Sequence, residues 1–196
     1  VFIDPARRRE GKRVFSLSEM EPSISAVLKL QQSQPNIAVK VAPGIAHEEI
    51  PAMAETEFIS EKNTLKEALL LFGGLKSGFI RTATILPGKH QMHHPGVEPQ
   101  VPTSEPLQYI YEPDPAVIRA ALVKALARDL DACQLDASIA YLTSDHLTAT
   151  PFARSWQVMR HGPFNLKTLN HWLREMNAGE VVIKKRGSPI EPDAFR

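Results

Sequence analysis

The chain has 196 residues, of which 43% are hydrophobic and 23% are charged, and its formal net charge is +1. This composition excludes a disordered chain, and the small net charge means that any surface for a polyanion must be local. The single cysteine, Cys133, excludes an internal disulfide framework and a cysteine-cluster metal site, so we expect a cytoplasmic protein. No apolar run approaches the roughly 20 residues of a membrane span, and we expect no membrane partner.

The chain begins with three large apolar residues and no initiator methionine. Val1, Phe2 and Ile3 are typical of the end of a buried parallel strand, which needs a neighbouring strand on each side. We therefore expect this chain to be the C-terminal part of a longer protein, with part of its sheet in the remaining sequence. A short edge strand at the start of the chain is the alternative.

A helix and a second strand follow. Residues 23–34 place apolar side chains at helical spacing and predict a helix. Residues 36–44 are apolar and β-branched, end at Pro-Gly and predict a buried strand. Strand, helix and strand in this order predict a βαβ unit in a parallel sheet with a right-handed crossover.

The next segments predict more strands. Residues 57–61 and 65–72 flank Lys62-Asn63-Thr64 and predict a hairpin, with a helix over 65–71 as the alternative. Residues 81–86 predict another strand, which stops at Pro-Gly.

A change in composition predicts a domain boundary. Five prolines and three histidines lie between Pro87 and Pro106 without helical periodicity. We therefore expect a first domain over residues 1–88, a proline-rich linker over 89–106 and an α+β domain over 107–196. The predicted strands of that domain are 108–111, 139–142, 155–160 and 180–184, and its predicted helices are 114–130 and 166–176, the second capped by Asn165.

The first candidate site is Asp4-Pro5, after the first predicted strand. Ligands of open α/β sheets bind outside the carboxyl ends of the strands, and a carboxylate fixed there by a proline can accept hydrogen bonds or a proton from a substrate. The alternative is a turn, because Asp-Pro is a common turn dipeptide.

These segments resemble a known family. VFIDPARR (residues 1–8) and VKVAPGI (39–45) look like the second half of a class I S-adenosylmethionine-dependent methyltransferase, in which an Asp-Pro motif follows the fourth strand at the substrate end. YEPDPAVIRAAL (111–122), IAYLTSD (139–145), PFARSWQV (151–158) and VVIKKRG (181–187) resemble the THUMP-like domain that follows it in one such family. The resemblance implies the C-terminal half of a Rossmann-like methyltransferase sheet followed by a small α+β THUMP-like domain, S-adenosylmethionine as cofactor and an RNA substrate.

The sequence departs from the family pattern in three ways. The glycine-rich loop and the acidic ribose-binding residue of the family are absent, so the cofactor-binding residues stay unknown and this chain alone is expected to be inactive. Arg7 stands where amino-group methyltransferases of the Asn/Asp-Pro-Pro-aromatic type place a stacking ring, which counts against that chemistry. The family of 5-methyluridine enzymes uses a cysteine nucleophile, but Cys133 lies in the other predicted domain.

Two basic stretches are candidate phosphate-binding sites. Arg7 and Arg8 belong to a loop with five basic residues in seven, and arginine suits bidentate phosphate contacts. Lys184, Lys185 and Arg186 end the last predicted strand, whose alternation sends Lys184 and Arg186 to one face. An ordinary solvated surface is the alternative at both places.

Three other groups are interpreted as structural. His90, His93 and His94 lack a carboxylate at metal-ligand spacing and indicate a polar linker, so we predict no metal site. Ser144-Asp145-His146 indicates a turn, because residues adjacent in sequence do not form a catalytic triad. Trp156 and Trp172 lie in apolar patterns and indicate core positions rather than stacking platforms.

The sequence supports two hypotheses from different classes. The first is the C-terminal part of an S-adenosylmethionine-dependent methyltransferase acting on RNA or another nucleobase-like substrate, with Asp4 and Pro5 as catalytic residues. Arg7, Arg8, Lys184, Lys185 and Arg186 would then bind the substrate. The second is a non-catalytic module that binds nucleic acid or protein.

Overall fold

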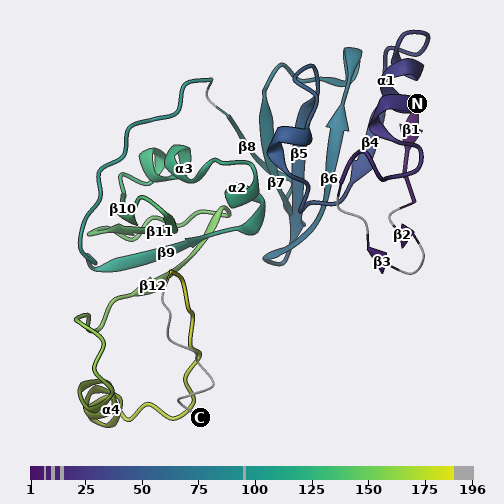
Figure 1. Cartoon of the computed structure of the whole chain (residues 1–196). Coiled ribbons are helices and arrows are strands. Elements are labelled where there is room, and N and C mark those ends of the chain that lie inside the picture. Colours follow the sequence, from purple (N-terminus) through teal and green to yellow (C-terminus); the bar gives the residue numbers. More distant parts are fainter. Residues whose placement is uncertain (7, 10–11, 14–15, 95, 188–196) are drawn as a thin grey trace.

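The computed structural model contains a six-stranded sheet and a four-stranded sheet, with short helices between them (Figure 1). It describes residues 1–6, 8–9, 12–13, 16–94 and 96–187, and for 8–9 and 12–13 the backbone only. Candidate Arg7 lies outside the described residues, and the side chain of Arg8 does too. The backbone of Arg8–Arg9 (β2) pairs with Lys12–Arg13 (β3) in a two-stranded antiparallel ladder.

The first sheet has six strands in the order β1-β4-β6-β5-β7-β8. Its strands are β1 (Phe2–Ile3), β4 (Ala38–Val41), β5 (Glu55–Glu61), β6 (Thr64–Leu71), β7 (Arg81–Leu86) and β8 (His90–His93). β1 pairs with β4 and β5 with β7 in parallel, whereas β6 runs antiparallel to both β4 and β5. The predicted βαβ unit is confirmed, because β1, α1 (Ile24–Gln31) and β4 follow one another and the two strands are parallel.

Local signals explain the start of α1 and the β5–β6 turn. The Ser23 side chain caps α1 by accepting a hydrogen bond from the Ala26 N–H at 3.4 Å. Lys62 and Asn63 adopt positive φ angles of 50° and 58°, which suit a two-residue hairpin turn. The predicted hairpin is therefore confirmed, and the alternative helix is not formed.

β1 lies at one edge of this sheet. Within the described part of the chain its one strand neighbour is β4, and the Phe2 side chain is 63% exposed. That β1 is buried between two neighbouring strands stays a prediction, which concerns a longer protein.

The second sheet is antiparallel throughout, in the order β10-β11-β9-β12. Its strands are β9 (Tyr109–Pro113), β10 (Cys133–Asp136), β11 (Ile139–Ser144) and β12 (Ala153–Gln157). Tyr111 is fully buried, donates its hydroxyl to the His146 carbonyl at 2.7 Å and accepts from the Thr148 N–H at 2.8 Å. These bonds fix the turn that contains Ser144-Asp145-His146, as the sequence indicated.

The single helix predicted over 114–130 is wrong. The structure has two short helices, α2 (Pro115–Arg119) and α3 (Val123–Asp129), separated at Ala121, where φ is 55°. The break lets the apolar residues of one sequence pattern reach two places, because α2 contacts β5, β6 and β7 while α3 contacts β10. Tertiary packing has overridden a continuous helical pattern here.

The predicted linker carries part of the first sheet. β8 falls within 89–106 and pairs with β7, and the buried apolar residues of both sheets form one cluster. The division into residues 1–88 and 107–196 stays a prediction.

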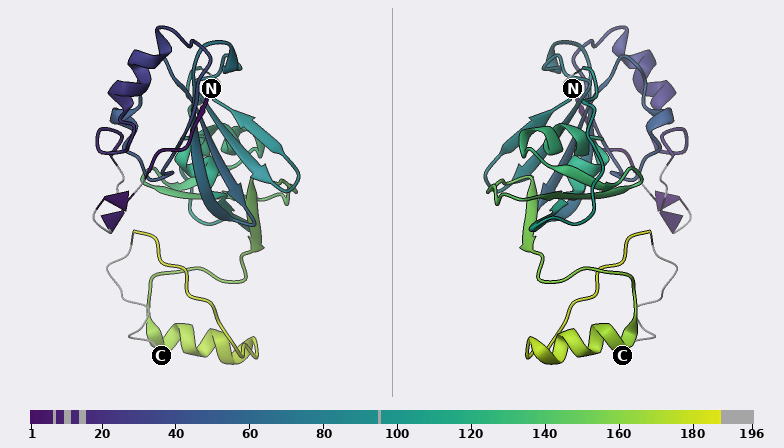
Figure 2. Two further views of the ribbon diagram at one scale, coloured as in Figure 1. Left: turned by 90° about the vertical axis from the view of Figure 1, so that its right-hand side faces the viewer. Right: turned by 90° about the vertical axis from the view of Figure 1, so that its left-hand side faces the viewer.

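After β12 the chain projects away from both sheets (Figures 1 and 2). The projecting segment, residues 159–183, contains α4 (Leu166–Glu175), and the Asn165 side chain caps this helix at Thr168 N–H as predicted. The strand predicted over 180–184 is wrong. These residues form no ladder, and Val182 is 81% exposed. Among the described residues, no helix combines the length and the apolar character needed to cross a bilayer.

Candidate functional sites

Asp4 and Pro5 lie at the carboxyl end of β1. The parallel register pairs Ile3 with Val39, which brings Asp4 beside Lys40 of β4. Lys40 Nζ donates to Asp4 Oδ2 at 3.2 Å and lies 3.4 Å from Glu67 Oε2 on β6. Pro5 is buried, whereas the Asp4 side chain is 49% exposed. The Asp4 carboxylate is therefore held by a cation on one side and accessible on the other.

Lys40 stays protonated between these two carboxylates. The hydrogen bond to Asp4, followed by the charge of Glu67, raises the pKa of Lys40. The Asp4 carboxylate accepts a hydrogen bond from this lysine and has further acceptor positions for a substrate donor.

A cavity of about 500 Å³ opens next to this corner. Ala6 forms part of its wall, and the N–H of Ala6 donates to the carbonyl of Glu21 at 2.9 Å. Glu19 and Glu21 also line it, so the wall carries acidic side chains where it is described. This cavity is open to an uncharged or cationic group rather than to a phosphate.

His47 follows β4 and covers the same sheet face as Phe58. The two rings stack with their centroids 5.8 Å apart, and Arg81 Nη1 lies 3.3 Å from His47 Nδ1. Burial, followed by the charges of Arg119 and Arg81, lowers the pKa of His47. The neutral ring can accept the hydrogen bond from Arg81, whereas an imidazolium would meet two neighbouring cations.

We expect the free energy of unfolding to fall as the pH is lowered below about 6.5. The unfolded chain takes up a proton at His47 more readily than the folded chain, in which this pKa is lowered, so acid favours unfolding. Thermal unfolding of the His47→Gln variant, measured from about pH 7.5 to pH 5.5, should show a shallower dependence than the parent. The exposed His161→Gln serves as control, and an unchanged slope in His47→Gln would contradict this assignment.

The second site surrounds Glu112 on β9. Its carboxylate accepts hydrogen bonds from Lys184 Nζ at 2.6 Å and Arg154 Nη2 at 2.6 Å, and Arg186 Nη2 lies 3.5 Å away. Tyr141 on β11 also donates its hydroxyl to Glu112 at 3.4 Å. We call these residues, together with Trp156, the Glu112 cluster.

The register of the second sheet explains this convergence. Glu112 lies directly opposite Arg154, and Trp156, two residues further along β12, shares the face of Arg154. Lys184 and Arg186 directly follow the projecting segment, and both reach the same carboxylate. Lys184 and Arg186 thus share one partner without the predicted strand, and the place of Lys185 stays a prediction.

Trp156 is not a core residue, which corrects the sequence interpretation. Its side chain is 41% exposed, with Lys184 Nζ 4.9 Å and the Arg154 guanidinium 5.6 Å from the ring centroid. Four of the five residues of β12, Trp156 among them, are exposed, so alternation along this strand does not lead into the core. An exposed ring flanked by two cations is the arrangement that stacks on a base while neighbouring charges meet phosphate.

The charges of the Glu112 cluster do not cancel. Burial alone would raise the pKa of Glu112, but hydrogen bonds from Lys184 and Arg154 outweigh it and lower that pKa. One carboxylate thus faces three cations, and the side chains of Arg154 and Arg186 are about half exposed. The cluster is a local positive surface in a chain of almost neutral net charge.

Replacing Glu112 by glutamine should lower the free energy of unfolding by about 1–3 kcal/mol at neutral pH. The carboxylate has a lowered pKa, so its stabilisation is present above the ordinary glutamate range and disappears as the pH falls through the folded pKa. Chemical unfolding of parent and variant should therefore converge in acid. Glu98→Gln, which removes an exposed partner of Lys124, is the control and should change stability by less than about 1 kcal/mol. Equal losses in the two variants would contradict the prediction.

The structure does not bring the two sites together. Asp4 belongs to the edge of the first sheet, whereas the Glu112 cluster belongs to the second sheet on the other side of the molecule (Figure 1). Any ligand that contacts both must be extended, as a polynucleotide is.

Comparisons with known proteins bear on both sites. Two Mycobacterium tuberculosis proteins, from strains CDC 1551 / Oshkosh and ATCC 25618 / H37Rv, are each 36% identical to this chain over 201 aligned residues. Both are named as uncharacterized S-adenosylmethionine-dependent methyltransferases, and the alignment covers the whole of this chain and 55% of each relative. The chain is homologous to S-adenosylmethionine-dependent methyltransferases. It spans about half the length of these relatives.

A family model and a solved structure agree with this relationship. Residues 153–196 match the family described as "THUMP domain-like". A crystal structure assigned as a methyltransferase from Porphyromonas gingivalis W83 superposes with a TM-score of 0.79 at 20% identity, covering all of this chain and 51% of that one. The predicted fold class, the C-terminal part of a methyltransferase sheet followed by a THUMP-like region, is confirmed.

The THUMP-like match contains three members of the Glu112 cluster that supply positive charge, namely Arg154, Lys184 and Arg186. Glu112 itself lies before the match, on β9. The cluster is thus formed between the matched segment and the strand that supports it.

Sequence reasoning missed Glu112 and Arg154. The one available signal was the spacing of Arg154 and Trp156, which places both on one face of a strand. Glu112 gave no signal, because its partners Lys184 and Arg186 lie more than seventy positions later and meet it through the return of the projecting segment.

The histidines of the predicted linker also have structural partners. His93 stacks on Phe79 with centroids 4.0 Å apart and shares a hydrogen bond of 3.0 Å with Thr82. Across the described ranges, no group of three or more metal-ligating side chains comes together.

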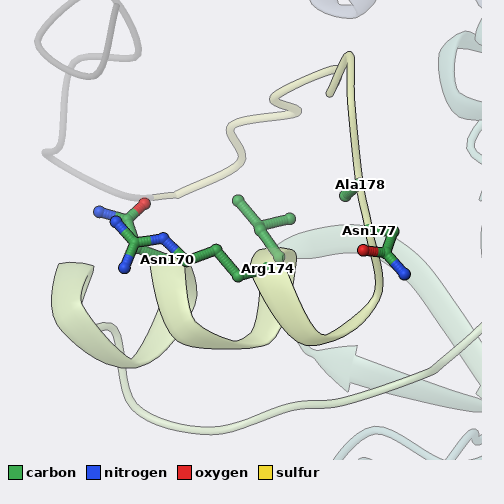
Figure 3. A pocket seen from close by; sticks show the side chains of 5 residues that line it. Asn170, Arg174, Asn177 and Ala178 are labelled. Atoms are coloured by element: carbon green, nitrogen blue, oxygen red, sulfur yellow. The ribbon is translucent and has the colours of Figure 1, made fainter.

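The C-terminal end of α4 borders a shallow hollow of about 650 Å³ (Figure 3). Asn170, Leu173, Arg174, Asn177 and Ala178 line it. It contains a single charged side chain, that of Arg174, and no carboxylate, so the lining offers no acid–base pair for catalysis.

Proposed function

We propose that this chain is the C-terminal part of an S-adenosylmethionine-dependent methyltransferase that acts on RNA or another nucleobase-like substrate. The observation that carries the proposal is the 36% identity to named methyltransferases along the whole chain, together with the shared fold. Here the chain supplies the acceptor side of the site, and the cofactor contacts lie in the part of the longer protein outside it.

The described residues fit a chain that supplies the acceptor side and not the cofactor contacts. No glycine-rich turn follows a parallel strand among them, whereas Asp4, Pro5 and the adjoining acidic cavity lie at the carboxyl end of β1. S-adenosylmethionine supplies an electrophilic methyl group when it is bound. The buried Pro5 fixes the backbone at Asp4, and the exposed oxygen of Asp4 then orients the acceptor N–H or O–H or takes its proton.

Lys40 restrains the carboxylate of Asp4 by binding one of its oxygens. Its ammonium holds Oδ2 of Asp4 at 3.2 Å, so the carboxylate cannot swing freely and keeps one oxygen for the acceptor. Rate acceleration in this proposal comes mainly from holding the acceptor against the methyl group, because orientation alone can supply several orders of magnitude.

The Glu112 cluster supports RNA as the acceptor. Lys184, Arg186 and Arg154 provide cations for phosphates, and Trp156 offers an exposed ring for an unpaired base. Lys185 lies in sequence between Lys184 and Arg186, whereas Arg7 and Arg8 follow Asp4-Pro5, and the contribution of these three residues to substrate binding is a proposal from sequence alone. The separation of this cluster from Asp4 fits a long substrate bound at one place and modified at another.

A non-catalytic binding module is the second candidate. The observation that favours it is that the Glu112 cluster is complete without Asp4 or a cofactor. Calorimetric titration of the full-length protein with S-adenosylmethionine discriminates the two. The methyltransferase proposal expects saturable binding, and absence of binding would favour the module.

A further inference from the structure

Arg119 on α2 reaches across to the loop that follows β4. Its Nε donates to the Pro43 carbonyl at 2.8 Å and its Nη2 donates to the Ile45 carbonyl at 2.6 Å. The guanidinium carbon lies 5.3 Å from the centroid of the Phe58 ring, which supports it on the sheet face. One side chain thus holds both carbonyls that flank Gly44, from an element more than seventy positions away in sequence.

The loop that Arg119 holds begins at the carboxyl end of β4, beside the carboxyl end of β1, where Asp4 lies. β1 and β4 are parallel neighbours, so the chain leaves β4 at Ala42 on the edge where Asp4-Pro5 leaves β1. Gly44, between the two bound carbonyls, is exposed. Gly44 is therefore an accessible backbone position on the acceptor side, whereas Ile45 is buried, and the position of this loop depends on a side chain from α2.

The same loop is also tied toward Asp4 at its far end. Glu49 Oε2 accepts from the Leu17 N–H at 2.7 Å and from the Ser16 hydroxyl at 2.8 Å. The segment that begins there runs to Glu21, whose carbonyl accepts from the N–H of Ala6, next to Pro5. Movement of the loop would consequently disturb the backbone on which Asp4 sits.

We infer that Arg119 is a positioning residue that fixes Pro43–Ile45 beside Asp4-Pro5 and thereby couples the acceptor site to the unit that carries the Glu112 cluster. β9 bears Glu112 and leads directly into α2, so the two functions lie on one continuous stretch of chain. The inference rests on the proposed methyltransferase function. It names a residue that does not itself touch the acceptor.

Arginine is required for this role. Its planar guanidinium presents several donors in fixed directions and bridges two carbonyls, whereas a lysine ammonium is a single point charge on a flexible stem. Arg119→Lys keeps the charge and most of the aliphatic contact but loses the bridge. This variant therefore separates positioning from general packing of α2 on the first sheet.

The test uses the full-length protein with Arg119→Lys, and with Arg119→Met as a second variant. Arg128→Lys on α3 is the matched control, because Arg128 contacts the adjacent Asp129. Hydrogen exchange at the 42–46 backbone should accelerate in both Arg119 variants and not in the control. In the methyl-transfer assay, kcat should fall roughly tenfold or more while KM for RNA and the Kd for S-adenosylmethionine change less than about twofold.

The hydrogen-exchange result and the methyl-transfer result can each overturn the inference separately. Unchanged loop exchange in Arg119→Lys would overturn the inference whether or not the protein is a methyltransferase. Faster exchange with unchanged kcat would also overturn it, since Arg119 would then be a structural clasp only. Absence of transfer in the parent protein would refute the proposed function and, with it, the positioning role. The exchange data would then report only whether Arg119 holds the loop.

Discussion

Replacing Asp4 with asparagine in the full-length protein is expected to reduce kcat for methyl transfer by about 100-fold, with no change in the affinity for S-adenosylmethionine. The amide keeps the shape of the side chain but loses the charge that accepts a proton or orients the acceptor. Asp4 is half exposed and its partner Lys40 remains near Glu67, so the loss of this surface ion pair should cost less than about 1 kcal/mol of stability. Single-turnover methyl transfer and calorimetry with the cofactor measure the two quantities.

Glu67→Gln is the control for Asp4→Asn. Both carboxylates contact the ammonium of Lys40, at 3.4 Å and 3.2 Å respectively, but only Asp4 follows β1 at the sheet edge. The Glu67 variant should retain activity within about threefold, because it removes no group from the acceptor side. Equal losses in the two variants would assign the effect to Lys40, and full activity in Asp4→Asn would remove Asp4 from the mechanism.

Truncation of the Glu112 cluster should weaken RNA binding in two distinguishable ways. Trp156→Ala should cost about 1–3 kcal/mol with little effect on the salt dependence, because stacking on an exposed ring carries no counterion release. Lys184→Ala should lower the slope of log K against log salt by about 1, because one phosphate contact is lost. Fluorescence anisotropy with labelled single-stranded RNA over a range of salt concentrations measures both effects in the full-length protein.

Arg128→Ala supplies the comparison for the binding experiment. Arg128 is an exposed arginine of the same unit, but it lies on α3 and pairs with Asp129. Its removal changes the net charge as Lys184→Ala does and should leave the affinity within about twofold. If Lys184→Ala and Arg128→Ala weaken binding equally and Trp156→Ala leaves it unchanged, the affinity comes from overall charge and the Glu112 cluster is not the binding surface.

Much of the fold was predictable because its signals are local. Ser23 and Asn165 cap α1 and α4 where the sequence places them, and Lys62-Asn63 forms the turn of the β5–β6 hairpin. Asp4-Pro5 was also found at the end of its strand, because a short apolar run followed by proline marks that end without any knowledge of the partners.

The errors arose where distant segments decide the structure. The apolar pattern from 114 to 130 fits one helix, but the packing of Val117 and Leu126 in separate helices breaks it at Ala121. Val182 and its neighbours have high strand propensity, yet they pair with no strand within the described chain. Trp156 looked like a core residue because alternation identifies two faces but not which of them a neighbouring element covers.

In the candidate sites, too, local patterns were predictable and contacts between distant segments were not. Lys184 and Arg186 were predicted on one face, and the structure adds the reason they stay there, which is the carboxylate of Glu112. Arg119 carried no sequence signal at all, because its partners are main-chain carbonyls and any residue type can supply these. Backbone recognition of this kind becomes visible only in three dimensions.

The decisive experiment is transfer of a radiolabelled methyl group from S-adenosylmethionine by the full-length protein, offered total RNA, DNA and protein from the same cells. We expect label in the RNA fraction, lost on ribonuclease treatment and strongly reduced in Asp4→Asn. Saturable cofactor binding with label in the DNA or protein fraction alone would contradict the assigned substrate. Label in none of the fractions, together with no cofactor binding, would contradict the methyltransferase proposal itself.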